Sequence, residues 1–257
     1  MLTATSAPLS VVPAIAGVGS LVSALDVMAA VGARGGRPPT RDAKDALGVQ
    51  ILAYQIDGRH EQAAGPEAFI DRIERHPPIA AELVELSGLL QARSTLGAKP
   101  VPGLEDTPLC LHAAYGAREV LKAVGWLTAA RRAPFQAGVL PLTSRKTELL
   151  FVTLDKSEGY HERISYHDYA ISAGRFHWQT QNSAGPDTPG GRRYLESAIN
   201  GWQFQLFVRP RKGEAYRACG RVALESAEGD RPMSIVWRFE IPLPARLFRE
   251  YSVLRGV

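Results

Sequence analysis

Polar side chains alternate with aromatic ones in the segment RFHWQTQ, residues 175–181. Successive side chains of a β-strand point to opposite faces. A strand here would therefore present its hydrogen-bonding groups, His177, Gln179 and Gln181, on one face and its aromatic rings on the other. Glutamine amides match the hydrogen-bonding edge of adenine. The segment predicts a strand that reads a nucleobase, and the alternative is an ordinary strand whose polar side faces water.

The loop NSAGPDTPGGRRY, residues 182–194, follows this segment and ends in two arginines, Arg192 and Arg193, at the start of a helix. Arginine binds phosphate through paired hydrogen bonds, and glycines allow backbone amides to approach an anion. Tyr166 and Tyr169 precede the strand and offer rings on which bases could stack. We interpret the whole region as a DNA-contacting surface, with a plain surface loop as the alternative.

The charge of the chain is concentrated near its end. The net charge is +4, and residues 205–257 hold ten basic and six acidic side chains, which account for the whole excess. Arg209, Arg211 and Lys212 follow an alternating apolar pattern and are further candidates for phosphate contact. Arginine outnumbers lysine 24 to 6, although GC-rich coding would produce the same bias.

A second interpretation is a metal-dependent nuclease. Acidic, basic and histidine side chains gather on and after the apolar segment TELLFVTLD at residues 147–155: Glu148, Asp155, Lys156, His161, Glu162, His167 and Asp168. Carboxylates beside a lysine can bind Mg²⁺ and orient a water. However, the two strand acids are seven residues apart, so an ideal strand places them on opposite faces. The DNA-binding interpretation is preferred, and it requires neither a cofactor nor a metal.

The front of the chain predicts helices. Residues 1–40 are apolar and unassigned, and residues 41–96 have helical spacing of apolar residues. In residues 65–76 the spacing places Phe69, Ile70 and Ile73 on one face, and in residues 77–94 it places Ile79 inward. These helices predict a packing layer without chemistry.

Residues 108–257 change to the period of strands. The segment at 147–155 is apolar on both faces and predicts a central strand. A helix is expected at 117–124, ended by Gly125, and another near 193–200. The fold class is therefore α+β: a helical layer followed by a curved antiparallel sheet or partial barrel with one or two helices. Three tryptophans occupy the apolar phase of their strands and should be largely buried: Trp178, Trp202 and Trp237.

Cysteine usage and hydropathy bear on the compartment. Cys110 and Cys219 lie far apart without metal-binding spacing, which is typical of reduced thiols in a cytoplasmic protein. The apolar residues 7–33 are interrupted by Pro13 and carry Asp26, so we expect no association with a membrane.

Several blocks carry a family resemblance: LCLHAAYGAREVLKAVG, YHDYAIS, FHWQTQNSAGPDTPGGRRY, LFVRPRK and RPMSIVWRFEIPLPARL. Together they resemble an uncharacterised domain at the C-terminal end of many bacterial DEAD/DEAH-type superfamily-two helicases, which often begin with a phospholipase-D-like nuclease. The resemblance covers roughly residues 108–250. It implies an association with DNA restriction, repair or phage defence.

The helicase motor itself is absent from this sequence. The chain has no GxxxxGK[ST] segment to hold ATP phosphates, no DEAD/DEAH box and no HxK nuclease motif. This favours a protein without catalytic activity of its own: a DNA-binding accessory module that partners a helicase or nuclease subunit. A protein-docking subunit without DNA affinity is the remaining alternative. The form of the DNA, whether duplex, single-stranded, mismatched or modified, stays open.

Overall fold

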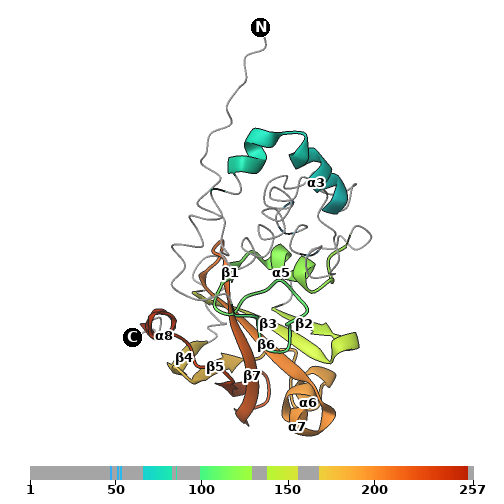
Figure 1. Ribbon diagram of the computed structural model, residues 1–257. Helices are drawn as coiled ribbons and strands as arrows, with labels where there is room; N and C mark the ends of the chain where they lie inside the picture. Colours follow the sequence, from blue (N-terminus) through green and yellow to red (C-terminus); the bar gives the residue numbers. More distant parts are fainter. Residues whose placement is uncertain are drawn as a thin grey trace.

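The computed structural model describes residues 47, 51, 53, 66–82, 85, 99–128, 138–155 and 168–253 (Figure 1). The strands are β1 (Ala114–Tyr115), β2 (Val139–Leu142), β3 (Thr147–Asp155), β4 (Tyr169–Ser172), β5 (Arg175–Gln179), β6 (Gln203–Arg211), β7 (Tyr216–Glu228) and β8 (Ser234–Phe239). The helices are α3 (Pro66–Glu74), α5 (Ala117–Ala123), α6 (Pro189–Leu195), α7 (Ser197–Asn200), α8 (Ala245–Val253) and the short 3-10 helix η3 (Thr143–Arg145). No described helix is long and apolar enough to cross a membrane.

The strands form one eight-stranded sheet in the order β2-β3-β6-β7-β8-β5-β4, and β1 pairs with the beginning of β7. The sheet is open, with β2 and β4 at its edges, so the expected α+β class is confirmed and the sheet does not close into a barrel. β3 and β6 are parallel, whereas the other neighbours are antiparallel. The parallel pair arises because the chain forms β4 and β5 at the far edge before it returns as β6.

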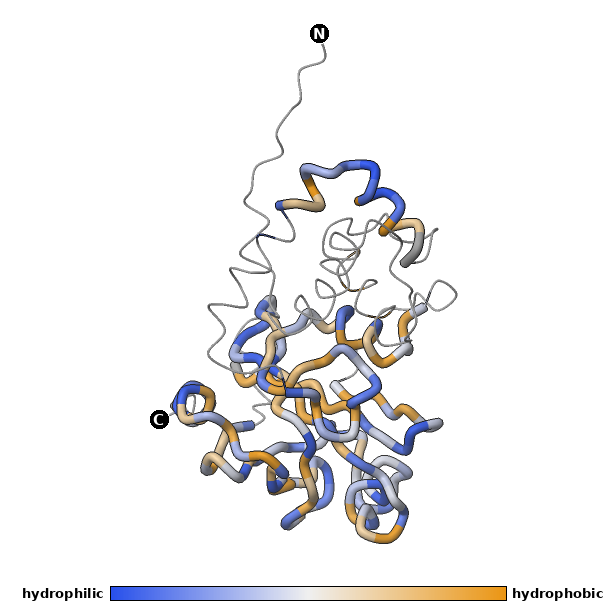
Figure 2. Tube along the Cα trace, viewed as in Figure 1, coloured by the Kyte–Doolittle hydropathy of each residue, from blue (hydrophilic) through white to orange (hydrophobic). Residues whose placement is uncertain are grey.

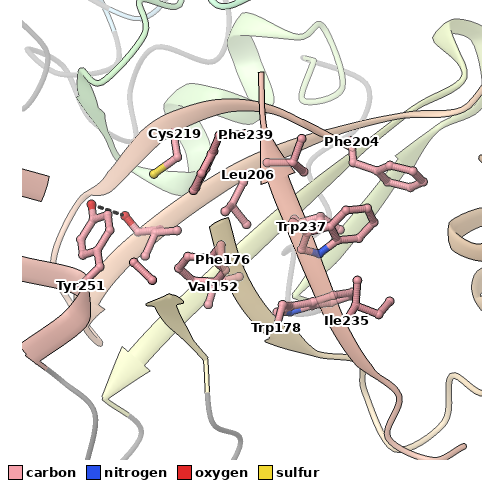
Figure 3. Packing of buried hydrophobic residues seen from close by; sticks show 14 of the residues in the cluster. Val152, Phe176, Trp178, Phe204, Leu206, Cys219, Ile235, Trp237, Phe239 and Tyr251 are labelled. Carbon is pink, nitrogen blue, oxygen red and sulfur yellow. Dashed lines mark hydrogen bonds between the residues drawn. The ribbon is translucent and has the colours of Figure 1, made fainter. Parts of the chain in front are cut away.

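Two hydrophobic clusters lie on opposite faces of the sheet, and β3, β6 and β7 contribute to both. The larger cluster contains Trp178, Phe204 and Trp237, and helix α8 contributes Tyr251 to it (Figure 3). Helix α6 contributes Tyr194. The second is covered by α5 and the segment 101–109. Apolar residues consequently recur along the central strands (Figure 2). This two-sided burial explains why β3 is apolar on both faces, as expected for a central strand.

The tryptophan burial agrees with the alternating pattern at two of three positions. Trp178 and Trp237 are buried, with 6% and 0% of their surface exposed. Trp202 is only partly buried because it precedes β6 and packs at the margin of the cluster. Helix α5 ends where it was expected, with Gly125 in the left-handed conformation at φ +70°.

The front of the chain agrees with the sequence in part. Helix α3 buries Phe69, Ile70 and Ile73, as its spacing predicts. The prediction for Ile79 is wrong, because this side chain is 46% exposed in the helical residues 77–82. Residues 1–40, with the apolar segment 7–33, lie outside the described residues.

His112 lies two residues before β1. It is buried, and its backbone has an unusual conformation. Its φ of 63° is left-handed, a region that non-glycine residues seldom occupy. Its N–H donates to the carbonyl of Ala218 at 2.7 Å, which fixes the turn before β1. Burial, and then the positive charges of Arg217 and Lys99, lower the pKa of His112 to about 4.

This depressed pKa gives His112 a pH-dependent effect on stability. The unfolded chain takes up the proton first as the pH falls below 6.5, so the stabilising contribution is complete above that pH and is lost toward pH 4. Between about pH 7.5 and about pH 5 we expect a loss of about 2 kcal/mol from this group. Urea unfolding at the two pH values measures this loss of unfolding free energy. The loss should be smaller in His112→Asn, which lacks the titrating imidazole, and asparagine is chosen because it tolerates the left-handed conformation. An equal loss in both proteins would contradict the assignment.

Candidate functional site

Strand β5 lies between β8 and β4, and its two faces differ as the sequence predicts. Phe176 and Trp178 enter the larger hydrophobic cluster, whereas His177 and Gln179 lie on the other face. The register places Tyr169 of β4 opposite His177, and Ser234 of β8 opposite Gln179. We call the four partly exposed side chains Tyr169, His177, Gln179 and Ser234 the β5 outer face.

Two rings of the β5 outer face are already stacked on each other. The centroids of Tyr169 and His177 are 5.1 Å apart, and their planes differ by 19°. Cross-strand neighbours stand close enough for such contacts, which stabilise a pair of strands. The stack joins edge strand β4 to β5 and orients two ring faces together, an arrangement on which a nucleobase can stack.

A polar network fixes the neighbouring Gln179. Its backbone N–H donates to Oδ1 of the buried Asp168 at 2.9 Å, and its side-chain Nε2 donates to Ser234 Oγ at 3.4 Å. Asp168 thereby holds the strand end at which the glutamine projects. The β5 outer face thus places an oriented amide beside the stacked rings, and this combination can contact both the edge and the plane of a base.

Two arginines extend the same face of the sheet along β5 and β8. Arg175 and Arg238 lie opposite each other in the register. Like charges in this position repel, and Glu225 offsets the repulsion through an ion pair with Arg175 at 2.8 Å. Arg238 is exposed and forms no ion pair with a carboxylate of the described residues. One positive charge therefore remains uncompensated about two residues along the strand from His177.

Gln181 does not belong to this face, although the sequence analysis placed it there. The strand ends at Gln179. Thr180 is buried, as the alternation predicts, and its Oγ1 accepts from Met233 N at 2.9 Å and donates to Ala184 O at 2.9 Å. Gln181 is exposed in the following turn, and its amide lies beside Gly138, the residue before β2. Gln181 is thus exposed, as expected, but it lies beyond the strand that carries His177 and Gln179.

The glycine-rich loop is built for packing instead of anion binding. Thr188 caps α6 by accepting from Gly191 N at 3.0 Å and also donates to Gly185 O at 2.7 Å. A Cβ on Gly191 would overlap the carbonyl oxygen of Gly185, so no larger residue fits there. Asp187 pairs with Arg231 and ties the loop to the turn before β8. The backbone amide of Gly191 is thus occupied within the fold.

Arg193 is paired with a buried carboxylate within the fold, whereas the sequence predicts that it contacts phosphate. Its Nε donates to Oε2 of the fully buried Glu148 at 2.7 Å, and its guanidinium lies 4.9 Å from the ring centroid of Trp202. The hydroxyl of Tyr194 donates to Oε1 of the same carboxylate at 3.0 Å. The pKa of Tyr194 is raised by burial and by the charge of Glu148. This network holds α6 against β3.

Arg192 remains exposed on α6 but is separated from the β5 outer face. Helix α6 packs on the larger cluster through Tyr194, which contacts Trp178 and Trp237 edge-on. His177 and Gln179 lie on the opposite side of the sheet. The structure therefore does not combine Arg192 with the glutamine and histidine in one surface.

The basic residues expected at the end of β6, Arg209, Arg211 and Lys212, lie at the opposite end of β7 from the β5 outer face. Arg209 is held by Thr153 Oγ1 at 2.8 Å and lies over the ring of Tyr216 at 4.5 Å, at the beginning of β7. Ser234, in contrast, is paired with Glu228 at the end of β7. Arg211 and Lys212 are exposed beside the β6–β7 turn. These residues and the β5 outer face thus flank opposite ends of a thirteen-residue strand (Figure 1).

The residues considered for a nuclease do not assemble into a metal site in the described part of the chain. No group of three His, Cys, Asp or Glu side chains suited to a metal is present among the described residues. Glu148 and Asp168 accept hydrogen bonds inside the fold, as given above. Tyr166, Lys156, His161, Glu162 and His167 lie outside the described residues.

Two functional candidates were missed by the sequence analysis, Ser234 and Arg238. Arg238 lies on the outer face of β8, where buried and less buried residues alternate, but nothing local indicates that β8 pairs with β5. The register supplies that information, because it aligns Ser234 with Gln179 and Arg238 with Arg175.

A comparison with curated proteins gives no match. A comparison with family models matches residues 109–251 to the domain of unknown function DUF3427. These residues include every strand of the sheet and all of the helices from α5 to most of α8. The match spans more than half of the chain, which therefore belongs to the DUF3427 family.

Proposed function

We propose that this protein is a noncatalytic DNA-binding accessory module, and that it contacts DNA through the β5 outer face. The observation that carries the proposal is the stacked pair Tyr169 and His177 beside the oriented amide of Gln179. Rings supply sequence-tolerant stacking for a base. The amide supplies hydrogen bonds to a base edge, adenine being the best match.

Arg238 provides the electrostatic part of the proposed contact. It projects from the same face of the sheet and carries a charge that no described carboxylate pairs with. A phosphate bound there would lie about two strand residues, roughly 7 Å, from the stacked rings, which is close to the spacing of successive nucleotides. Arg238, with the paired Arg175, replaces Arg192 and Arg193 as the proposed phosphate contact.

Stacking on the partly exposed rings of Tyr169 and His177 requires a base that is out of its own stack. The proposal therefore favours single-stranded DNA, or a nucleotide turned out of a duplex, over regular duplex DNA. The helicase or nuclease partner is proposed on the family resemblance of the sequence blocks.

A fluorescence-anisotropy titration of labelled single-stranded and duplex oligonucleotides at several salt concentrations tests this proposal. Arg238→Ala should weaken binding to all sequences and reduce the salt slope by about one. Tyr169→Ala should cost about 1–3 kcal/mol on any single strand. Gln179→Ala should cost about 1–3 kcal/mol on the preferred sequence and little on others.

Arg192→Ala is the matched control, because it removes one exposed arginine from the other side of the sheet. It should leave the affinity nearly unchanged, with folding of each variant checked by circular dichroism. Wild-type protein that binds no oligonucleotide would favour the docking-subunit alternative. Cleavage that depends on Mg²⁺ would favour the nuclease alternative. Equal losses for Arg192→Ala and Arg238→Ala would reject the β5 outer face as the contact.

A further inference from the structure

Three basic side chains meet near the beginning of β7, on a different part of the fold from the β5 outer face. Lys99 precedes the bridge between Pro100 and Cys110, and its carbonyl accepts from Leu111 N at 2.7 Å. His112 follows directly. Arg217 of β7 donates from Nη1 to the carbonyl of His112 at 3.4 Å. The loop and the strand therefore bring Lys99, His112 and Arg217 into one neighbourhood.

The imidazole of His112 is buried without a hydrogen-bond partner. Its residue is 7% exposed, and its Nε2 makes no hydrogen bond. A buried polar nitrogen without a partner costs free energy, and such groups are rare in folded proteins. The backbone at this residue is also left-handed, a kind of strain that concentrates at functional sites. The unpartnered nitrogen is the feature of this residue that points to a ligand.

The charges around this nitrogen are positive and uncompensated. Neither Lys99 nor Arg217 forms an ion pair with a carboxylate of the described residues, and the bond to His112 is the single hydrogen bond of the Arg217 side chain among them. Glu250 also lies near Arg217, around Tyr251, but the two do not come within ion-pair distance. Both cations contribute to the lowered pKa of His112. An acceptor with negative charge would satisfy all three groups.

We infer that Lys99, His112 and Arg217 form an oxyanion-binding site of the phosphate class. Lys99 is exposed, Arg217 is partly buried and His112 is buried, so the three groups lie at increasing depth below the surface. The anion would accept hydrogen bonds from the guanidinium of Arg217, the ammonium of Lys99 and the Nε2–H of His112. The bonds from the two cations are charge-assisted.

This site does not depend on the proposed DNA contact of the β5 outer face. His112 and Arg217 lie where β1 pairs with the beginning of β7, whereas Ser234 faces the end of that strand. The anion has two sources with the same chemistry: a phosphate of a DNA backbone or a free phosphate group. The variants that test the two surfaces are different.

The test is a titration with inorganic phosphate at about pH 7 and constant ionic strength, followed by NMR of the His112 Cε1–H signal. The signal is assigned by its loss in His112→Asn. We expect a saturable shift with phosphate, and no saturable shift when chloride replaces it. Lys99→Gln and Arg217→Gln should each weaken phosphate binding on the order of tenfold, since each removes one charge-assisted contact. Arg246→Gln, an exposed arginine on α8, is the control and should bind phosphate as wild type does.

A labelled oligonucleotide distinguishes the two sources. Competition between phosphate and the oligonucleotide, lost in Lys99→Gln, would identify a backbone phosphate as the ligand. Saturable phosphate binding without competition would identify a free anion. Because Lys99 is exposed, Lys99→Gln should keep the fold and remain informative even if Arg217→Gln does not. A His112 signal that does not respond to phosphate, or that responds in Lys99→Gln and Arg217→Gln as it does in wild type, would overturn the inference.

Discussion

Trp237→Ala should lower the free energy of unfolding by about 3–5 kcal/mol. Trp237 is fully buried at the centre of the larger hydrophobic cluster, where its ring centroid lies 4.8 Å from that of Phe204 and 6.1 Å from those of Trp178 and Tyr194 (Figure 3). Alanine would leave a cavity between β6, β5 and α6, and these elements cannot all collapse into it. Urea unfolding followed by circular dichroism measures the change.

Trp237→Phe is the matched comparison for this prediction. Phenylalanine keeps an aromatic ring in the site and removes the indole Nε1, a buried nitrogen without a hydrogen-bond partner. The loss of volume is thus partly offset by the removal of an unsatisfied donor. We expect a loss well below that of alanine. A loss below about 1 kcal/mol for Trp237→Ala would contradict the central position of this residue.

The strand phases around this tryptophan could be predicted from the sequence because they depend on local alternation. Phe176, Trp178, Ile235 and Trp237 are all buried, as period two in RFHWQTQ and SIVWRFE indicates. The same rule correctly separated His177 and Gln179 from the core. It also left Gln181 exposed, but it did not predict that the strand ends before this residue, at Gln179.

The pairing of strands could not be predicted in this way. A residue pattern records which face is apolar, but it does not record which strand lies beside which. β5 pairs with β8, more than fifty residues later, and this pairing creates the surface that combines Gln179 with Ser234 and Arg175 with Arg238. β3 and β6 are likewise parallel neighbours, although β4 and β5 lie between them in the sequence. The composition of the site is therefore a product of tertiary structure.

The role of Arg193 shows the same limit for charges. An arginine pair at the start of a helix is compatible with phosphate binding, and nothing local distinguishes Arg192 from Arg193. The distinction comes from Glu148, which lies 45 residues earlier and is buried directly beneath Arg193. A buried carboxylate requires a partner, so the structure uses one arginine internally and leaves the other exposed.

Arg193→Ala should therefore destabilise the protein by about 3–5 kcal/mol, because it leaves the Glu148 carboxylate buried without its ion pair. Tyr194 would still donate to that carboxylate, but one neutral hydroxyl does not compensate a buried charge. Arg192→Ala should change stability by less than about 0.5 kcal/mol, as is usual for an exposed side chain. Urea unfolding of the two single variants compares arginines that are adjacent in sequence and differ in burial.

Glu148→Gln separates the charge from the other contacts of Arg193. Glutamine keeps the shape of the side chain and can still accept from Tyr194, but it carries no charge. In this background the further change Arg193→Ala should cost only about 1 kcal/mol, mainly for its contact with the Trp202 ring. Equal costs in the two backgrounds would show that Arg193 stabilises the fold through Trp202 and not through Glu148. If Arg193→Ala instead reduced the affinity for DNA without any loss of stability, Arg193 would be a phosphate contact. The buried ion pair would then not be its function.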